Sequence, residues 1–206
     1  MPQQEGVIKF KLEHTLSDPL SQEKLAELNT WREWMFARGL IGETNTPQGK
    51  VGYGNISCRM PEGFAITGSQ TGHLAHLTPK EYALVTDCQP EQNLVISKGP
   101  IQPSSESLTH AVLYQLDEKI NWVMHAHHTP IWGAAKELGL PCTSPDVAYG
   151  TPEMAVETIR LFGETDVRQK GIFAMAGHEE GIVSFGETPE QTSEVLSHYL
   201  ILCRRL

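Results

Sequence analysis

Near its middle the chain carries the segment Trp122-Val123-Met124-His125-Ala126-His127-His128, in which an apolar run leads directly into three histidines. The apolar run predicts a buried β-strand. Successive side chains of a strand point to opposite faces, so His125 and His127 are expected to project side by side while His128 points the other way. Imidazole nitrogens are common ligands of divalent metals. The segment therefore predicts a strand that carries two metal ligands and a fold built around it.

The length and composition are those of a soluble folded domain. The chain has 206 residues, of which 39% are hydrophobic and 20% are charged. A chain of this length buries a substantial hydrophobic core without needing disulfides. We expect one domain over residues 1–206, with residues 1–18 as a candidate extended arm.

The charge and the cysteines exclude several classes of function. A formal net charge of -9 argues against nucleic acid or an anionic membrane as the main partner, because both require a basic face. Residues 1–18 show neither a signal peptide nor a membrane span, so a cytoplasmic location is expected. The four cysteines lack Cys-x-x-Cys spacing and are expected to be reduced, with no disulfide framework or thiolate zinc site.

Helix signals recur along the chain. Apolar residues at helical spacing predict an opening helix over 21–38, which Gly39 ends. Three Thr-Pro pairs predict further helix starts, because they place a capping hydroxyl before a proline at the first helical position. Two of these starts also have a capping-box residue three positions on. The pairs are Thr78-Pro79 with Glu81, Thr151-Pro152, and Thr188-Pro189 with Gln191.

Strand signals alternate irregularly with these helices. A hairpin is predicted over residues 51–67, around the turn at Pro61-Glu62-Gly63. Later strands are predicted at 94–97, 121–125, 172–176 and 182–185. Strict βαβ alternation is missing, which favours a mainly antiparallel sheet covered by helices over a doubly wound parallel sheet. The predicted class is α/β.

Two further residues are candidates for chemistry beside the histidine pair. His178 lies in a glycine-flanked turn between two apolar strands, where side chains can converge on a shared site. Three imidazoles suit Zn²⁺ well. Glu106 follows Ser104 and Ser105 at the start of a predicted helix, whose free N–H groups and dipole favour an anion such as phosphate. The alternatives are ordinary hydrogen-bonded histidines and a simple helix cap.

A second candidate anion site is the loop Thr67-Gly68-Ser69-Gln70-Thr71-Gly72. Its glycines let the backbone approach a ligand and its hydroxyls can donate hydrogen bonds. A plain turn is the alternative. Asn55, between two β segments, is a candidate for substrate binding or for shaping a turn.

In this order, Asn55, the Thr-Gly loop, Ser104-Ser105-Glu106, the His-x-His pair and His178 resemble the motifs of the class II aldolase/adducin family, which includes L-fuculose-phosphate aldolase and L-ribulose-5-phosphate 4-epimerase. The resemblance extends from the opening helix to Tyr199. It implies a three-layer αβα sandwich with a mainly antiparallel sheet, in a homotetramer with active sites between subunits. It also implies a small sugar or sugar phosphate as substrate.

The resemblance implies a role for each matched residue. Zn²⁺, or another divalent metal such as Mn²⁺, Co²⁺ or Fe²⁺, would be bound by His125, His127 and His178. Glu106 would be the acid/base beside the metal. The positions implied for phosphate and substrate binding are Asn55, Thr71, Gly72, Ser104 and Ser105. The metal would polarise the oxygens of a ketose and stabilise an enediolate.

Several reactions are compatible with this set. Retro-aldol cleavage leads, and dehydration of the methylthioribulose-1-phosphate type, 4-epimerisation and decarboxylation are alternatives within the family. Outside it stand a zinc hydrolase, since a metal with an open position generates hydroxide near neutral pH, and a non-catalytic adducin-like module. The chain lacks the longer segment that carries the family's tyrosine acid, which leaves Tyr149 and Tyr199 as candidates. It also reads His178-Glu179-Glu180-Gly181 where the family commonly has His-Gly.

Overall fold

An eight-stranded sheet runs through the computed structural model, which describes residues 7–47 and 49–206. The strand order is β1-β7-β6-β5-β4-β8-β10-β9, and every neighbouring pair is antiparallel except β1 with β7. The strands are β1 (Lys11–Leu16), β4 (Asn55–Met60), β5 (Gly63–Thr67), β6 (Tyr82–Gln89), β7 (Leu94–Gly99), β8 (Trp122–His127), β9 (Ile172–Ala174) and β10 (Gly181–Gly186). A separate hairpin pairs β2 (Gly42–Thr46) with β3 (Gly49–Tyr53).

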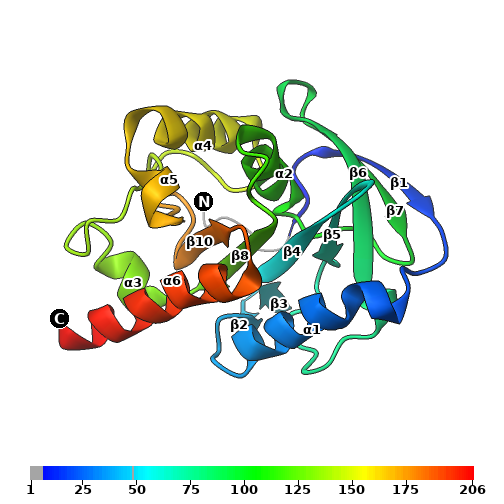
Figure 1. Cartoon of the computed structure of the whole chain (residues 1–206), viewed down its shortest axis with the longest axis horizontal. Helices are drawn as coiled ribbons and strands as arrows, with labels where there is room; N and C mark the ends of the chain where they lie inside the picture. The colour runs from blue at the N-terminus through cyan, green and yellow to red at the C-terminus, as the bar shows by residue number, and fades with distance from the viewer. Residues whose placement is uncertain (1–6, 48) are drawn as a thin grey trace.

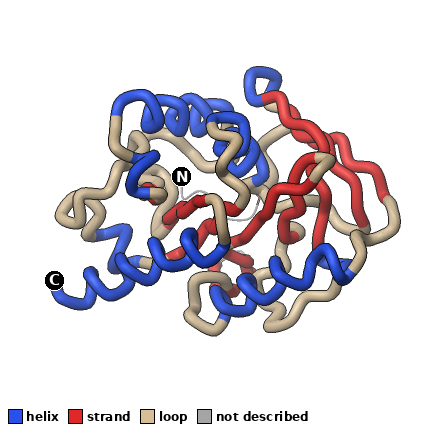
Figure 2. The backbone as a smooth tube through the Cα atoms, viewed as in Figure 1, coloured by secondary structure: helices blue, strands red, loops and turns tan. Residues whose placement is uncertain are grey.

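Helices cover both faces of the sheet and complete three layers (Figures 1 and 2). One face packs on α2 (Ser107–Leu116), α4 (Pro152–Glu164) and α5 (Val167–Lys170). The other packs on α1 (Gln22–Phe36), α3 (Thr129–Gly133) and α6 (Pro189–Leu202). Each face has its own hydrophobic core, so the predicted αβα class with a mainly antiparallel sheet is confirmed. Within the described part of the chain, no helix is both long and apolar enough to cross a bilayer.

Strand β8 places the histidine pair on one face. Val123 joins the core beneath α2 and α4, whereas Met124 and Ala126 join the core beneath α1 and α6. Because side chains alternate along a strand, His125 and His127 lie on the face that packs against α2. The prediction of two histidines side by side on a buried strand is confirmed.

The helix signals were correct in most places. Ser21 caps α1 by accepting from the Lys24 N–H, and Gly39, with φ of +69°, follows its end. The starts at Thr151-Pro152 and Thr188-Pro189 are confirmed as α4 and α6.

Two helix expectations were wrong. Thr78 and Glu81 form the predicted capping box, but it opens only the 3₁₀ turn η1 (Pro79–Glu81). The chain then enters β6, where pairing with β5 and β7 on both sides overrides the local helix signal. Gln191 does not complete a capping box, because its side-chain oxygen accepts from the Glu187 N–H rather than from Thr188.

Two regions of the sheet differ from the sequence prediction. Residues 11–16 of the candidate arm form β1, parallel to β7, while residues 1–6 lie outside the described part of the chain. The hairpin over residues 51–67 is confirmed as β4 and β5, but the β2–β3 hairpin before it was not predicted. The four cysteines are free thiols, as predicted.

Candidate active site

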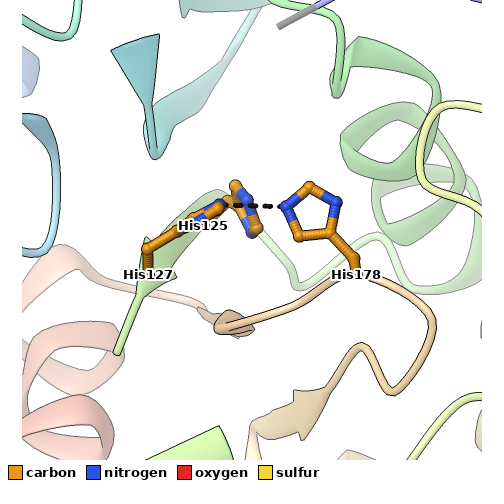
Figure 3. Close-up of side chains that lie close together, drawn as sticks. All are labelled: His125, His127 and His178. Atoms are coloured by element: carbon orange, nitrogen blue, oxygen red, sulfur yellow. Dashed lines mark hydrogen bonds between the residues drawn. The ribbon is translucent and has the colours of Figure 1, made fainter. Parts of the chain in front are cut away.

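Three histidines converge at one end of β8 (Figure 3). His125 and His127 come from the strand, and His178 comes from the turn between β9 and β10. One ligand nitrogen from each ring lies within 4.8 Å of the others. The Nε2 atoms of His127 and His178 are 2.9 Å apart, and the ring centroids are 4.9 to 5.2 Å apart. The structure therefore brings the three predicted ligands together.

The turn that carries His178 is folded closely over β8. Gly181 lies opposite His127 in the ladder between β10 and β8, and its N–H donates to the His178 carbonyl. A Cβ on Gly177 would lie 2.1 Å from the Val147 carbonyl oxygen, so only glycine fits there. These contacts explain how a residue 51 positions beyond His127 reaches the same site.

The donor set fits a divalent metal. Nitrogen ligands about 2.0–2.1 Å from a tetrahedral Zn²⁺ stand roughly 3.3 Å apart, so the His127–His178 pair needs to open by only about 0.4 Å. All three side chains are buried, as a structural or catalytic metal site requires. His128 points away and accepts from the Ile131 N–H at the start of α3, which agrees with the prediction that it points to the other face of the strand.

Glu106 faces this cluster from the start of α2. Its side chain is 3% exposed and makes no capping hydrogen bond to the helix. One carboxylate oxygen lies 3.8 Å from His178 Nδ1, and the other accepts from the Thr109 hydroxyl. Because the carboxylate is not used as a cap, the geometry favours a role beside the histidines over the simple capping alternative.

A cavity adjoins the histidines and Glu106, and every predicted substrate-binding residue lines it. It is lined by Gly52, Tyr53, Gly54, Asn55, Gly68, Ser69, Gln70, Thr71, Gly72, Ser104, Ser105, Glu106 and His125. We call it the anion pocket, after the phosphate-binding role that the sequence predicts for its residues. Asn55 lies opposite His125 in the sheet register, and its side-chain oxygen has no hydrogen-bond partner among the described residues. Of the described lining residues, none is a lysine or arginine.

The hydroxyls of the anion pocket differ in what they offer a ligand. The Thr71 hydroxyl donates to the Gly68 carbonyl, so its proton is used inside the loop. Ser104 Oγ accepts from the Glu106 N–H, which leaves its own proton to donate. Ser104 therefore keeps a hydroxyl proton that it can offer to a ligand, whereas the proton of the Thr71 hydroxyl is already engaged.

The loop 68–72 needs its glycine and its unusual backbone. Gln70 has a φ of +61°, which a non-glycine residue adopts rarely. A Cβ on Gly72 would lie 2.1 Å from the Gly42 carbonyl oxygen of the β2–β3 hairpin. The hairpin thus packs directly behind the loop and fixes its path.

Tyr53 was not predicted as a site residue. It lines the anion pocket and also a second cavity of about 600 Å³, which His127 lines as well. Its ring centroid is 5.2 Å from that of His127, and its hydroxyl donates to the Gly39 carbonyl. Burial raises the pKa of this hydroxyl, and the nearby negative charge of Glu180 adds to the effect. No local motif marks a tyrosine that lines two cavities.

The two candidate tyrosine acids lie in different places. Tyr149 is buried with its ring edge against His178, at a centroid distance of 4.6 Å, and its hydroxyl accepts from the Val7 N–H. Tyr199 belongs to the core beneath α1 and α6, on the opposite face of the sheet from the histidines. Of these two candidates, Tyr149 is the one beside the predicted metal ligands.

A buried three-histidine cluster beside a glycine-rich pocket, within an αβα sandwich, is the arrangement expected of a metal-dependent enzyme. The family described as Class II Aldolase and Adducin N-terminal domain matches residues 48–205. The chain belongs to this family, which confirms the resemblance and the prediction of a metal-dependent lyase of the class II aldolase type.

Solved structures share the fold. The L-fuculose-1-phosphate aldolase of Thermus thermophilus is 21% identical with a TM-score of 0.63, over 90% of this chain and 95% of that one. YgbL of Escherichia coli is 19% identical with a TM-score of 0.65, over 90% and 88%. The sugar-phosphate aldolase of Thermotoga maritima is 16% identical with a TM-score of 0.60, over 89% and 94%. A search of curated proteins finds no match.

Proposed function

We propose that this protein is a Zn²⁺-dependent lyase that splits a small ketose phosphate by retro-aldol cleavage. One observation carries the proposal: the anion pocket is lined by Glu106 and by His125 of the three-histidine cluster, so a substrate held by its phosphate would present its carbon chain to them. The Thermus thermophilus and Thermotoga maritima neighbours are sugar-phosphate aldolases by name, which supports this substrate class.

The anion pocket is suited to hold the phosphate. Ser104 and Ser105 precede α2, whose N-terminal N–H groups and dipole stabilise negative charge. The backbone of Thr71 and Gly72 approaches from the other side, and Asn55 offers an amide. Holding the phosphate in place lowers the barrier by keeping the reacting carbons next to the proton-transfer groups.

Different side chains carry out the proton transfers of the reaction. In cleavage, the hydroxyl proton leaves, the carbon–carbon electron pair passes to the ketone fragment, and that fragment is protonated on carbon. We assign to Glu106 the proton exchange at carbon, and its burial beside the histidines supports this assignment. A bound Zn²⁺, or Mn²⁺, Co²⁺ or Fe²⁺ in its place, would polarise the substrate oxygens.

Tyr149 is the residue that we assign to the oxygen side of the reaction, where in the reverse, aldol-addition direction it would donate the proton that the hydroxyl loses on cleavage. Its ring packs on His178, and a phenol hydroxyl that accepts from the Val7 N–H also carries a proton of its own. Tyr149→Phe is expected to lower turnover at least about tenfold with the metal retained. Tyr199→Phe, a buried tyrosine on the other face of the sheet, is the matched control and is expected to keep turnover. Equal activity in the two variants would refute the assignment.

The assembly follows from the family resemblance. We take the 206 residues to act as a single domain in a cytoplasmic homotetramer with the sites near subunit contacts. Light scattering on the purified protein measures this directly, and a monomer that is fully active would contradict it.

The experiment that tests the reaction is an NMR screen of ketose phosphates in D₂O with zinc-loaded protein. Retro-aldol cleavage predicts two carbonyl fragments and deuterium on the carbon next to the ketone. Loss of water would indicate the dehydratase, inversion at one carbon the epimerase, and loss of CO₂ from a carboxylated substrate the decarboxylase. Release of free phosphate or alcohol, with no exchange at carbon, would refute the lyase in favour of a zinc hydrolase.

A further inference from the structure

Among the described residues, no cationic side chain lines the anion pocket to help hold a phosphate. Its described lining includes the Glu106 carboxylate and no lysine or arginine, in a chain of net charge -9. A phosphate carries nearly two negative charges at neutral pH. Backbone N–H groups and hydroxyls can bind it, but they bind more strongly where a nearby cation polarises them.

Arg32 lies directly behind the loop that forms one wall of this pocket. It projects from α1 and is only 1% exposed. One guanidinium nitrogen, Nη2, donates to the carbonyls of Thr71 and Gly72 at 3.2 Å each. The other, Nη1, donates to the carbonyl of Ala75 at 2.9 Å. The guanidinium and the pocket are therefore separated by a single layer of peptide groups.

The buried charge of Arg32 is only partly compensated within the described structure. Its three hydrogen bonds go to carbonyl oxygens, and no described carboxylate lies within ion-pair distance. Glu33 acts on it only over a longer range, and the Glu33 carboxylate itself pairs with His76 at 2.9 Å. Burial lowers the pKa of the Arg32 guanidinium, yet an arginine stays protonated throughout the physiological range.

The peptide groups connect this charge to the pocket. All described peptide bonds are trans, so the N–H of each group points away from its C=O. The peptide whose Thr71 carbonyl accepts from Arg32 carries the N–H of Gly72, a residue that lines the pocket, on its opposite edge. A cation held at the carbonyl edge polarises the peptide and makes the N–H a better donor to an anion.

We propose that Arg32 is a positioning residue of the anion pocket: it holds the Thr71–Gly72 peptide in its donor orientation and places a cationic side chain behind a bound phosphate. The inference rests on the proposed function, since it concerns the same phosphate. It adds a residue 39 to 43 positions away in sequence that touches no ligand itself.

The test is calorimetric titration of inorganic phosphate into zinc-loaded protein, with zinc content and Tm measured for each variant. Arg32→Met removes the charge at similar volume, and Arg32→Lys keeps the charge but loses the two-nitrogen fork. Arg59→Met is the matched control, because Arg59 also donates to three carbonyls, those of Tyr114, Asp117 and Ile120, and lines a different cavity.

Arg32→Met is expected to weaken phosphate binding at least about tenfold, which is about 1.4 kcal/mol. The phosphate affinity of Arg32→Lys should lie between those of Arg32→Met and the wild type. Arg32→Lys serves as the test if Arg32→Met does not fold. Arg59→Met should lower Tm while phosphate affinity stays within about twofold. Unchanged affinity in the Arg32 variants, or an equal loss in Arg59→Met, overturns the inference alone. A wild-type protein that binds no phosphate overturns the phosphate-binding part of the proposed function as well.

Discussion

His110 is expected to make the folded protein sensitive to acid. Its side chain is fully buried on α2, one turn after Glu106, with Nδ1 2.7 Å from the Ser57 hydroxyl. Ser57 in turn contacts the Tyr114 hydroxyl at 2.7 Å. The other ring nitrogen, Nε2, has no hydrogen-bond partner in the described part of the chain. Nothing in this surrounding compensates a positive charge, and burial lowers the pKa of His110 from 6.5 to about 3.

The size of the effect follows from proton linkage. The unfolded chain binds a proton at this histidine near pH 6.5, whereas the folded chain binds it only near pH 3. The free energy of unfolding is therefore highest above pH 6.5 and falls as the pH is lowered towards 3. At 1.36 kcal/mol per pKa unit the full loss is about 5 kcal/mol, which is a large share of the stability of a typical domain.

Urea unfolding of the chelator-treated protein between pH 7 and pH 4 measures this loss. Below pH 6, the free energy of unfolding of the wild type is expected to fall more steeply than that of His110→Gln, by about 1 kcal/mol per pH unit. The variant itself should be less stable at pH 7, because the buried packing changes. His76→Gln, an exposed histidine, is the control and should keep the wild-type slope. Parallel curves for the wild type and His110→Gln would refute the reasoning.

Three further outcomes are expected. Gly72→Ala places a Cβ 2.1 Å from the Gly42 carbonyl oxygen, so the free energy of unfolding should fall by about 1–3 kcal/mol, and both Tm and phosphate affinity should fall with it. A variant with wild-type values would show that the loop has room for the methyl group. Glu106→Gln should keep its zinc and lose proton exchange at carbon in D₂O, and exchange at the wild-type rate would exclude Glu106 as the base. Chelation should lower Tm, and added Zn²⁺ should restore it. At a free Zn²⁺ concentration one hundred times Kd, the metal should raise the free energy of unfolding by about 3 kcal/mol. No change in Tm would argue against a metal site in the folded state.

Much of the fold was readable from local sequence because the decisive signals were strong. The apolar run before His125 and the Thr-Pro caps of α4 and α6 act within a few residues. The strand β6 was missed because the capping box at Thr78 is real, and only pairing with β5 and β7 turns the next residues into a strand. The β2–β3 hairpin was missed because its residues are mostly polar and glycine, without a hydrophobic alternation.

In the candidate site, too, local sequence predicted some features, while others depend on tertiary contacts. Alternation along β8 predicted that His125 and His127 share a face, and the structure agrees. The approach of His178 depends on a tight turn packed against Val147, which spacing alone does not reveal. Arg32 and Tyr53 were missed because their roles depend on contacts to distant loops, and an arginine on an amphipathic helix ordinarily predicts a solvated charge.

The measurement that tests the central claim most directly is metal content by mass spectrometry in three purified proteins: the wild type, His127→Ala and His128→Ala. The two variants remove neighbouring histidines, of which one faces the cluster and the other caps α3. The account predicts one bound divalent ion per chain in the wild type and in His128→Ala, and loss of the ion in His127→Ala. Equal metal in both variants, or none in the wild type after incubation with Zn²⁺, would contradict it.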